Sequence, residues 1–128
     1  MARSRASAKA AGAAFERLVA DYLADQLDDR IDRRVKTGAA DKGDIGGVRD
    51  RDGARVVIEA KDYGGRLQLP EWTREAAAER DNDGAAIGVV VAKRLGTRDP
   101  GSQWVAMTLA DLVYLLGGNQ TGGSSEGR

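Results

Sequence analysis

The segment from 54 to 61 reads ARVVIEAK, an apolar run that ends on a carboxylate and an ammonium group. In a β-strand successive side chains point to opposite faces, so Glu59 and Lys61 share one face of the predicted strand. A second apolar run, AIGVVVA over residues 86–92, is nearly continuous and is typical of a strand covered on both faces. Together the two segments predict the centre of a sheet, with charged side chains at the end of one strand.

Turn signals and helical periodicity divide the rest of the chain around these two strands. The sequence DRDG over residues 50–53 predicts a hairpin turn, and glycine and proline predict a loop over residues 93–103. Apolar side chains at i+3 and i+4 spacing predict the first helix. We expect helices over residues 7–28, 71–82 and 109–116, and strands over residues 31–37, 43–49, 54–61, 86–92 and 104–107.

The order α-β-β-β-α-β-β-α predicts an α/β fold in which one mixed central sheet is flanked by helices. The length of 128 residues suits one domain. We expect that domain to cover residues 1–116. Residues 117–128, GGNQTGGSSEGR, are rich in glycine, serine and polar groups, which predicts a disordered tail.

Composition excludes several kinds of chemistry. The chain has neither Cys nor His, which excludes disulfides, thiolate or imidazole metal ligands and catalysis by those side chains. Any metal must be bound by oxygen, which favours Mg²⁺, Mn²⁺ or Ca²⁺. The chain has no GxxxxGK[ST] motif, so we expect no nucleotide cofactor. It also has no apolar run of membrane-spanning length and no apolar signal segment, so we expect a cytoplasmic protein without a membrane partner.

Asp44, on the preceding predicted strand, brings a second carboxylate to the charged end of residues 54–61. If the hairpin loop has an even number of residues, Asp44 lies opposite Glu59 or Lys61 and on their face of the sheet. Only an odd loop without a compensating bulge would place Asp44 on the other face. Two carboxylates about 5 Å apart repel unless a cation lies between them, so the pair indicates a site for one hard cation. The alternative is a structural ion pair on a half-exposed strand.

Two further features surround this pair. Three glycines within residues 43–47 predict a bulge or bend in the strand, or room for a substrate to come close. Glu16 is the only acid in the first twenty residues and lies beside the apolar stripe of the first helix, one turn after Gly12. It either faces a cleft or is a solvated helix residue.

These acids resemble, in their order along the chain, the pattern of the PD-(D/E)XK nucleases. The motifs are Glu16, then Gly43-Asp44-Ile45, then Ile58-Glu59-Ala60-Lys61. The similarity is strongest to the small Holliday junction resolvases of archaeal and phage type and to RecB-like nuclease domains. It runs from about Ala11 to Leu116 and implies a restriction-endonuclease-like fold with an αβββαβ core. The proline that names the family is absent, since Gly43 precedes Asp44.

The resemblance implies a role for each of these residues. Asp44 and Glu59, with Glu16 directly or through water, match the acids that bind Mg²⁺, for which we expect Mn²⁺ to substitute. Mg²⁺ lowers the pKa of bound water and neutralises charge on the scissile phosphate. Lys61 matches the catalytic lysine that positions or deprotonates the attacking water. Gln68 resembles an accessory glutamine that some relatives place near the site.

Positive charge is clustered although the chain is neutral, with 20 Lys and Arg against 20 Asp and Glu. Local basic patches suit a partner that touches one face, such as the phosphate backbone of DNA. The alternative is an ordinary solvated surface. The residues that we expect to contact DNA are Arg3, Arg5, Lys9, Arg33, Arg34, Lys36, Lys93 and Arg94.

We therefore expect a structure-selective endodeoxyribonuclease that resolves four-way (Holliday) junctions in recombination and repair. It would act in the cytoplasm, the host's if the protein is phage-encoded. A RecB-like exonuclease or a restriction-type enzyme that cuts duplex DNA is the alternative within this class, and an inactive DNA-binding domain is the alternative outside it. Paired cuts need two sites, so we expect a homodimer. Its interface would draw on Leu112, Tyr114, Leu115 and Trp72, whereas Trp104 is expected in the core.

Overall fold

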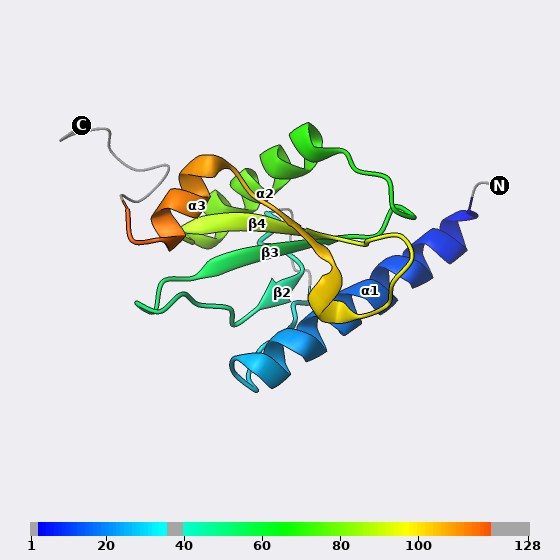
Figure 1. Cartoon of the computed structure of the whole chain (residues 1–128), viewed down its shortest axis with the longest axis horizontal. Coiled ribbons are helices and arrows are strands. Elements are labelled where there is room, and N and C mark those ends of the chain that lie inside the picture. The colour runs from blue at the N-terminus through cyan, green and yellow to red at the C-terminus, as the bar shows by residue number, and fades with distance from the viewer. Residues whose placement is uncertain (1–2, 36–39, 119–128) are drawn as a thin grey trace.

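The computed structural model of the chain describes residues 3–35 and 40–118. The described residues form an α/β fold, a five-stranded mixed sheet with three α-helices, in the order predicted from the sequence (Figure 1). The helices are α1 (Arg5–Gln26), α2 (Leu69–Asp83) and α3 (Leu109–Leu115), and a short 3-10 helix covers Pro100–Ser102. The strands are β1 (Asp32–Arg33), β2 (Ile45–Gly46), β3 (Val56–Lys61), β4 (Ile87–Ala92) and β5 (Trp104–Ala106).

The sheet has the strand order β1-β2-β3-β4-β5. The central pair β3 and β4 is parallel and joined through α2, whereas the other neighbours are antiparallel. Of the predicted strand 31–37, whose residues 36 and 37 lie outside the described chain, the described part has two strand residues, and the predicted strand 43–49 also has two. The long strands are therefore β3 and β4, which the apolar runs predicted.

The hairpin between β2 and β3 reaches the expected register through an odd loop and a compensating bulge. Its loop is Arg51, Asp52 and Gly53, an odd number, closed by a bridge between Arg49 and Arg55. An odd loop alone would turn Asp44 to the other face of the sheet. The extra residue is absorbed at Gly47, whose φ of 89° is typical of a bulge, so that Ile45 pairs with Ile58. Asp44 consequently lies level with Glu59.

The two faces of the sheet are covered by different helices. Phe15 and Val19 of α1 pack in an apolar cluster with Ile58, Ile87 and Val89. On the opposite face α2 contributes Trp72 and Ala76, which pack against the alternate residues of β4. A Cβ at Gly88 would lie 2.4 Å from the Ala76 carbonyl oxygen, so this glycine lets α2 approach β4 closely. Residues 86–92 are thus covered on both sides, as predicted.

The two tryptophans correct two predictions. Trp104 is 45% exposed, with the Arg94 guanidinium 4.3 Å from its ring centroid, so it is not a core residue. Trp72 is fully buried, and it cannot contribute to an interface between copies of the chain. Both outcomes follow from placement, because β5 is an edge strand and Trp72 points from α2 into the sheet.

Two further predictions concern the ends and gaps of the described chain. The predicted disordered tail, residues 117–128, falls mostly outside the described residues, which end at 118. Lys36 also lies outside them. None of the described helices combines the length and the apolar character that a membrane span requires.

Candidate active site

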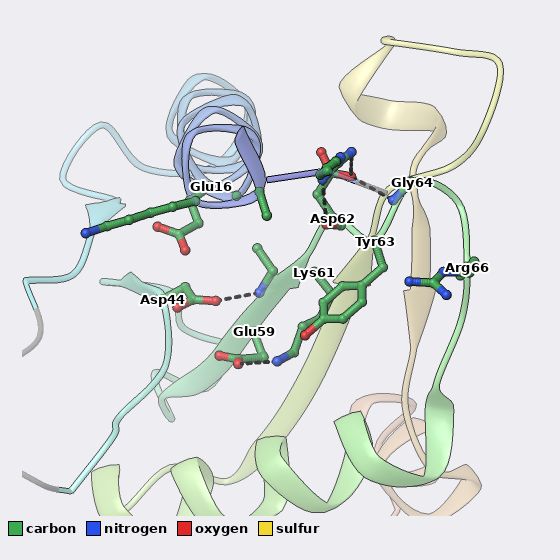
Figure 2. A pocket seen from close by; sticks show the side chains of 13 residues that line it. Glu16, Asp44, Glu59, Lys61, Asp62, Tyr63, Gly64 and Arg66 are labelled. Carbon is green, nitrogen blue, oxygen red and sulfur yellow. Dashed lines mark hydrogen bonds and ion pairs between the residues drawn. The ribbon is translucent and has the colours of Figure 1, made fainter. Parts of the chain in front are cut away.

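A cavity of about 890 Å³ opens between α1 and the charged end of β3 (Figure 2). It is lined by the four residues that the sequence predicted to be catalytic, Glu16, Asp44, Glu59 and Lys61. Three basic side chains, Arg3, Lys9 and Arg66, line the same cavity. Residues far apart in the sequence are therefore brought to one solvent-accessible place.

Asp44 is held against β3 by the backbone. Its N–H donates to the Ile58 carbonyl at 3.0 Å, and its Oδ2 accepts from the Ala60 N–H at 2.8 Å. The preceding Gly43 has a φ of 97°, and a Cβ there would lie 2.8 Å from Val57 Cγ1. Only glycine tolerates this backbone conformation and this close contact without strain, so Gly43 allows the Asp44 carboxylate to pack closely against β3.

Glu59 and Lys61 form an ion pair that extends to α2. Lys61 Nζ lies 3.2 Å from Glu59 Oε2 and 3.1 Å from Glu75 Oε1. Burial opposes the charge on Lys61, but the carboxylates of Glu59 and Glu75 outweigh it and raise the pKa of the ammonium group. Lys61 is therefore positively charged at neutral pH. Sequence reasoning missed Glu75, which only the packing of α2 on β3 brings to Lys61.

Burial and neighbouring acids favour the neutral, protonated form of Glu59. Desolvation, and then the charge of Asp44, raise the pKa of the Glu59 carboxyl well above its usual range. Glu79 of α2 has a raised pKa for the same first cause, and Asp41 and Asp44 add to it. The two glutamates are 5% and 4% exposed, so solvent screens their repulsion little. Without a cation the pair retains protons that ordinary carboxyl groups lose.

Glu16 lines the cavity, but an arginine holds it. Figure 2 shows its carboxylate pointing towards Asp44, and Arg33 Nη2 lies 3.0 Å from Glu16 Oε1. Glu16 is half-buried, so it is neither a fully solvated helix residue nor a buried ligand. Arg33, predicted to bind DNA, is engaged in this pair.

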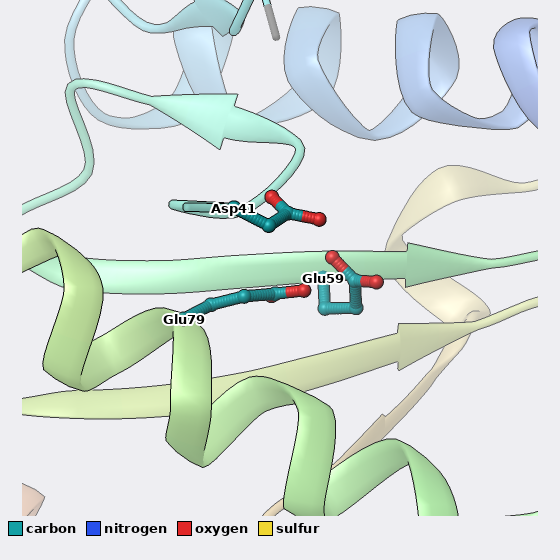
Figure 3. A group of neighbouring side chains, drawn as sticks. All are labelled: Asp41, Glu59 and Glu79. Carbon is teal, nitrogen blue, oxygen red and sulfur yellow. The ribbon is translucent and has the colours of Figure 1, made fainter. Parts of the chain in front are cut away.

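The tightest group of acids in the described chain is a different one. One carboxylate oxygen from each of Asp41, Glu59 and Glu79 lies within 4.8 Å of the other two (Figure 3). Sequence reasoning missed Asp41 and Glu79. A signal for Glu79 was present, because it follows Trp72 and Ala76 at i+7 and i+3 and so continues the buried stripe of α2. The position of Asp41 depends on the path of the loop before β2.

The remaining predicted DNA-binding residues differ in how free they are. Arg3 pairs with Asp62 at 3.0 Å and Arg34 with Asp83 at 2.9 Å. Lys93 donates to two backbone carbonyls of its own loop, and Arg94 stacks on Trp104. Arg5 is exposed, and Lys9 lies in the wall of the cavity.

Gln68 does not reach the cavity. It occupies the N-cap position of α2, makes no capping hydrogen bond with its side chain and is absent from the described residues that line the cavity. Its predicted accessory role therefore lacks support from the geometry.

The side chains present fit a hard divalent cation. Every candidate donor is a carboxylate oxygen, the type that Mg²⁺ and Ca²⁺ prefer. Glu59 Oε1 and Glu79 Oε1 are buried without a hydrogen-bond partner, which is costly for a carboxylate unless a proton or a cation satisfies it.

Comparisons of the chain with protein-family models, curated proteins and solved structures find no match.

Proposed function

We propose that the protein is a Mg²⁺-dependent endodeoxyribonuclease that acts on branched DNA and resolves four-way junctions. The observation that carries the proposal is the position of Asp44 beside Glu59, with Lys61 on the same strand and all three lining one open cavity. Phosphodiester hydrolysis needs negative charge on the phosphate to be neutralised and a water molecule to be activated. An oxygen-only acid cluster beside a half-buried lysine supplies groups for both tasks.

Asp44 and Glu59 would hold the cation, with Glu16 contributing directly or through water. Bound there, Mg²⁺ would lower the pKa of water and neutralise phosphate oxygens. Lys61 acts as a cation, because its raised pKa keeps the ammonium group protonated at neutral pH. It orients the attacking water and stabilises charge on the phosphate, which leaves proton removal to another group.

Basic side chains at the cavity would bind the DNA backbone. Lys9 and Arg66 line the cavity and form no ion pair within the described residues, and Arg3 lies beside them. Contacts between such residues and phosphates release counterions, so binding should weaken steeply with salt. We propose that this activity is cytoplasmic, in the host if the protein is phage-encoded.

A homodimer would supply the two cuts that junction resolution requires. Apolar side chains on α3 are exposed, among them the predicted interface residues Leu112 and Leu115. Tyr114 is half-buried and donates its hydroxyl to Asp50, so it contributes less surface than predicted. Sedimentation of the free protein and of its junction complex at micromolar concentration tests this assembly, and a strict monomer in both would contradict it.

Cleavage of a mobile four-way junction, measured beside its linear arms under single-turnover conditions with Mg²⁺, tests the function. We expect paired cuts in the junction, loss of cutting in Asp44→Asn and Glu59→Gln, and DNA binding close to wild type in both. Ca²⁺ should permit binding with little cutting, because its longer coordination activates water poorly. Glu71→Gln, which removes an exposed acid from the first turn of α2, is the matched control.

Each other outcome of this assay has a defined meaning. Cutting of linear arms at the junction rate would favour a restriction-type enzyme or an exonuclease. Junction binding without cutting in Mg²⁺ or Mn²⁺ would favour a DNA-binding domain that lacks activity.

A further inference from the structure

Glu59 faces two groups of acids. Asp44 lies beside it in the open cavity, whereas Asp41 and Glu79 approach it from the loop before β2 and from α2 (Figure 3). The metal-binding acids predicted from the sequence include neither Asp41 nor Glu79. This second group therefore needs its own explanation.

The second group is built from three separate elements that hold its side chains in place. Asn82 Nδ2 donates to the Asp41 carbonyl at 2.7 Å, and the Gly43 N–H donates to Asp41 Oδ1 at 2.9 Å. Glu79 is carried by α2, which Trp72 fixes against the sheet. The acids are thus preorganised, although together they repel one another.

Buried oxygens aimed into the group have no partner. Glu59 Oε1 and Glu79 Oε1 lack any hydrogen bond, although the two side chains are only 5% and 4% exposed. Lys61 pairs with the other oxygen of Glu59, and no described lysine or arginine pairs with Asp41 or Glu79. A bound cation would satisfy all these oxygens at once.

We propose that Asp41, Glu59 and Glu79 bind a divalent cation of about the size of Ca²⁺, at a site that shares Glu59 with the Asp44 cavity. The proposal goes beyond the nuclease function and does not depend on it. The three oxygens lie within 4.8 Å of one another. Ca–O distances of about 2.3–2.6 Å allow two ligands to lie up to about 5 Å apart, whereas Mg–O distances of about 2.1 Å require closer approach. Water would complete the coordination.

Calorimetric titration with Ca²⁺ tests the site in the Asp44→Asn variant, which removes the acid that only the open cavity uses. We expect this variant to bind one Ca²⁺ per chain. Adding Glu79→Gln should weaken that binding at least about tenfold, because one of three protein ligands is lost. Adding Glu71→Gln instead removes an exposed acid from the same helix and should leave binding unchanged.

Two results would overturn the proposal. One is Ca²⁺ binding by Asp44→Asn that is unaffected by Glu79→Gln. The other is no Ca²⁺ binding by Asp44→Asn at millimolar concentration, which would mean that a proton shared between Glu59 and Glu79 satisfies the group. If Asp44→Asn does not fold, the same titration compares the wild type with Glu79→Gln, and in that variant the binding of one Ca²⁺ should weaken at least about tenfold. Cleavage plays no part in these measurements, so their failure and the failure of the nuclease proposal remain distinguishable.

Discussion

The two faces of the sheet differ in what they bury. Between α1 and the sheet the buried cluster is entirely apolar and includes Phe15, Ile45 and Ile58. On the α2 face the buried apolar cluster is smaller, and Glu59 and Glu79 lie beside it with unpartnered oxygens. Burial of apolar groups stabilises a fold, whereas burial of like charges destabilises it unless a ligand is bound. The apolar cluster under α1 therefore stabilises the fold, whereas the buried acids beside α2 and the cavity at the end of β3 carry the candidate chemistry.

Replacement of Lys61 by Ala should have the largest effect, on the rate of junction cleavage. We expect a loss of about 10²–10⁴-fold at saturating Mg²⁺, because the variant lacks the cation that stabilises charge on the phosphate. Single-turnover cleavage measures the rate, and thermal melting confirms that the variant is folded. Lys42→Ala, which removes an exposed lysine, should cut at the wild-type rate. A near-wild-type rate for Lys61→Ala would remove Lys61 from the mechanism.

Replacement of Phe15 by Ala tests the α1 face. Phe15 is buried in the apolar cluster, and its loss leaves a cavity, so we expect the free energy of unfolding to fall by about 3–5 kcal/mol. Urea denaturation with chelator present measures the change. Leu27→Ala, a truncation of a side chain that is 65% exposed, should cost less than about 0.5 kcal/mol. Similar losses in the two variants would contradict the assignment of stability to this face.

Replacement of Glu79 by Gln should raise the free energy of unfolding, unlike Phe15→Ala, and the gain should depend on pH. Burial raises the pKa of Glu79 to about 7, so the folded chain retains a proton that the unfolded chain releases. The free energy of unfolding of the metal-free wild type should therefore fall as pH rises from about 5 to about 8. Gln removes the titrating group and should raise stability at pH 8 by about 1–3 kcal/mol.

Urea denaturation at three pH values in chelator measures this profile. The Glu71→Gln control should keep the wild-type slope. If the free energy of unfolding of the wild type rises from about pH 5 to about pH 8, and Glu79→Gln brings no gain, the buried acids beside α2 do not destabilise the metal-free fold.

Replacement of Glu16 by Gln should have the smallest effect, because this residue is carried by the stabilising helix but lines the cavity. Its ion pair with Arg33 is partly exposed, so the free energy of unfolding should change by less than about 1 kcal/mol. The cleavage rate should fall by about tenfold, as expected for a residue that supports metal ligands. Asp21→Asn, an exposed acid on the same helix, is the control for both measurements. Unchanged cleavage in Glu16→Gln would leave Asp44 and Glu59 as the acids of the cavity.

The hairpin between β2 and β3 illustrates how far local sequence rules reach. Period-2 alternation put Glu59 and Lys61 on one face, and the structure agrees. The sequence left the loop length open; the loop is odd, and Asp44 still lies on the face of Glu59 because the bulge at Gly47 restores the register. The glycines predict a bulge somewhere in the strand, but its position, and so the register of the pairing, depends on which pairing buries Ile45.

The sequence by itself determined the order of helices and strands, the two central strands, and the shared face of Glu59 and Lys61 at the end of β3. These follow from short-range periodicity, which a local stretch of chain records completely. Only the tertiary structure decided that Glu79 and Asp41 lie against Glu59, that Glu75 shares Lys61, and that Trp104 is exposed. Those contacts depend on how closely α2 packs on the sheet and on where the sheet ends. Such long-range choices are set by the burial of the whole core and not by any one segment.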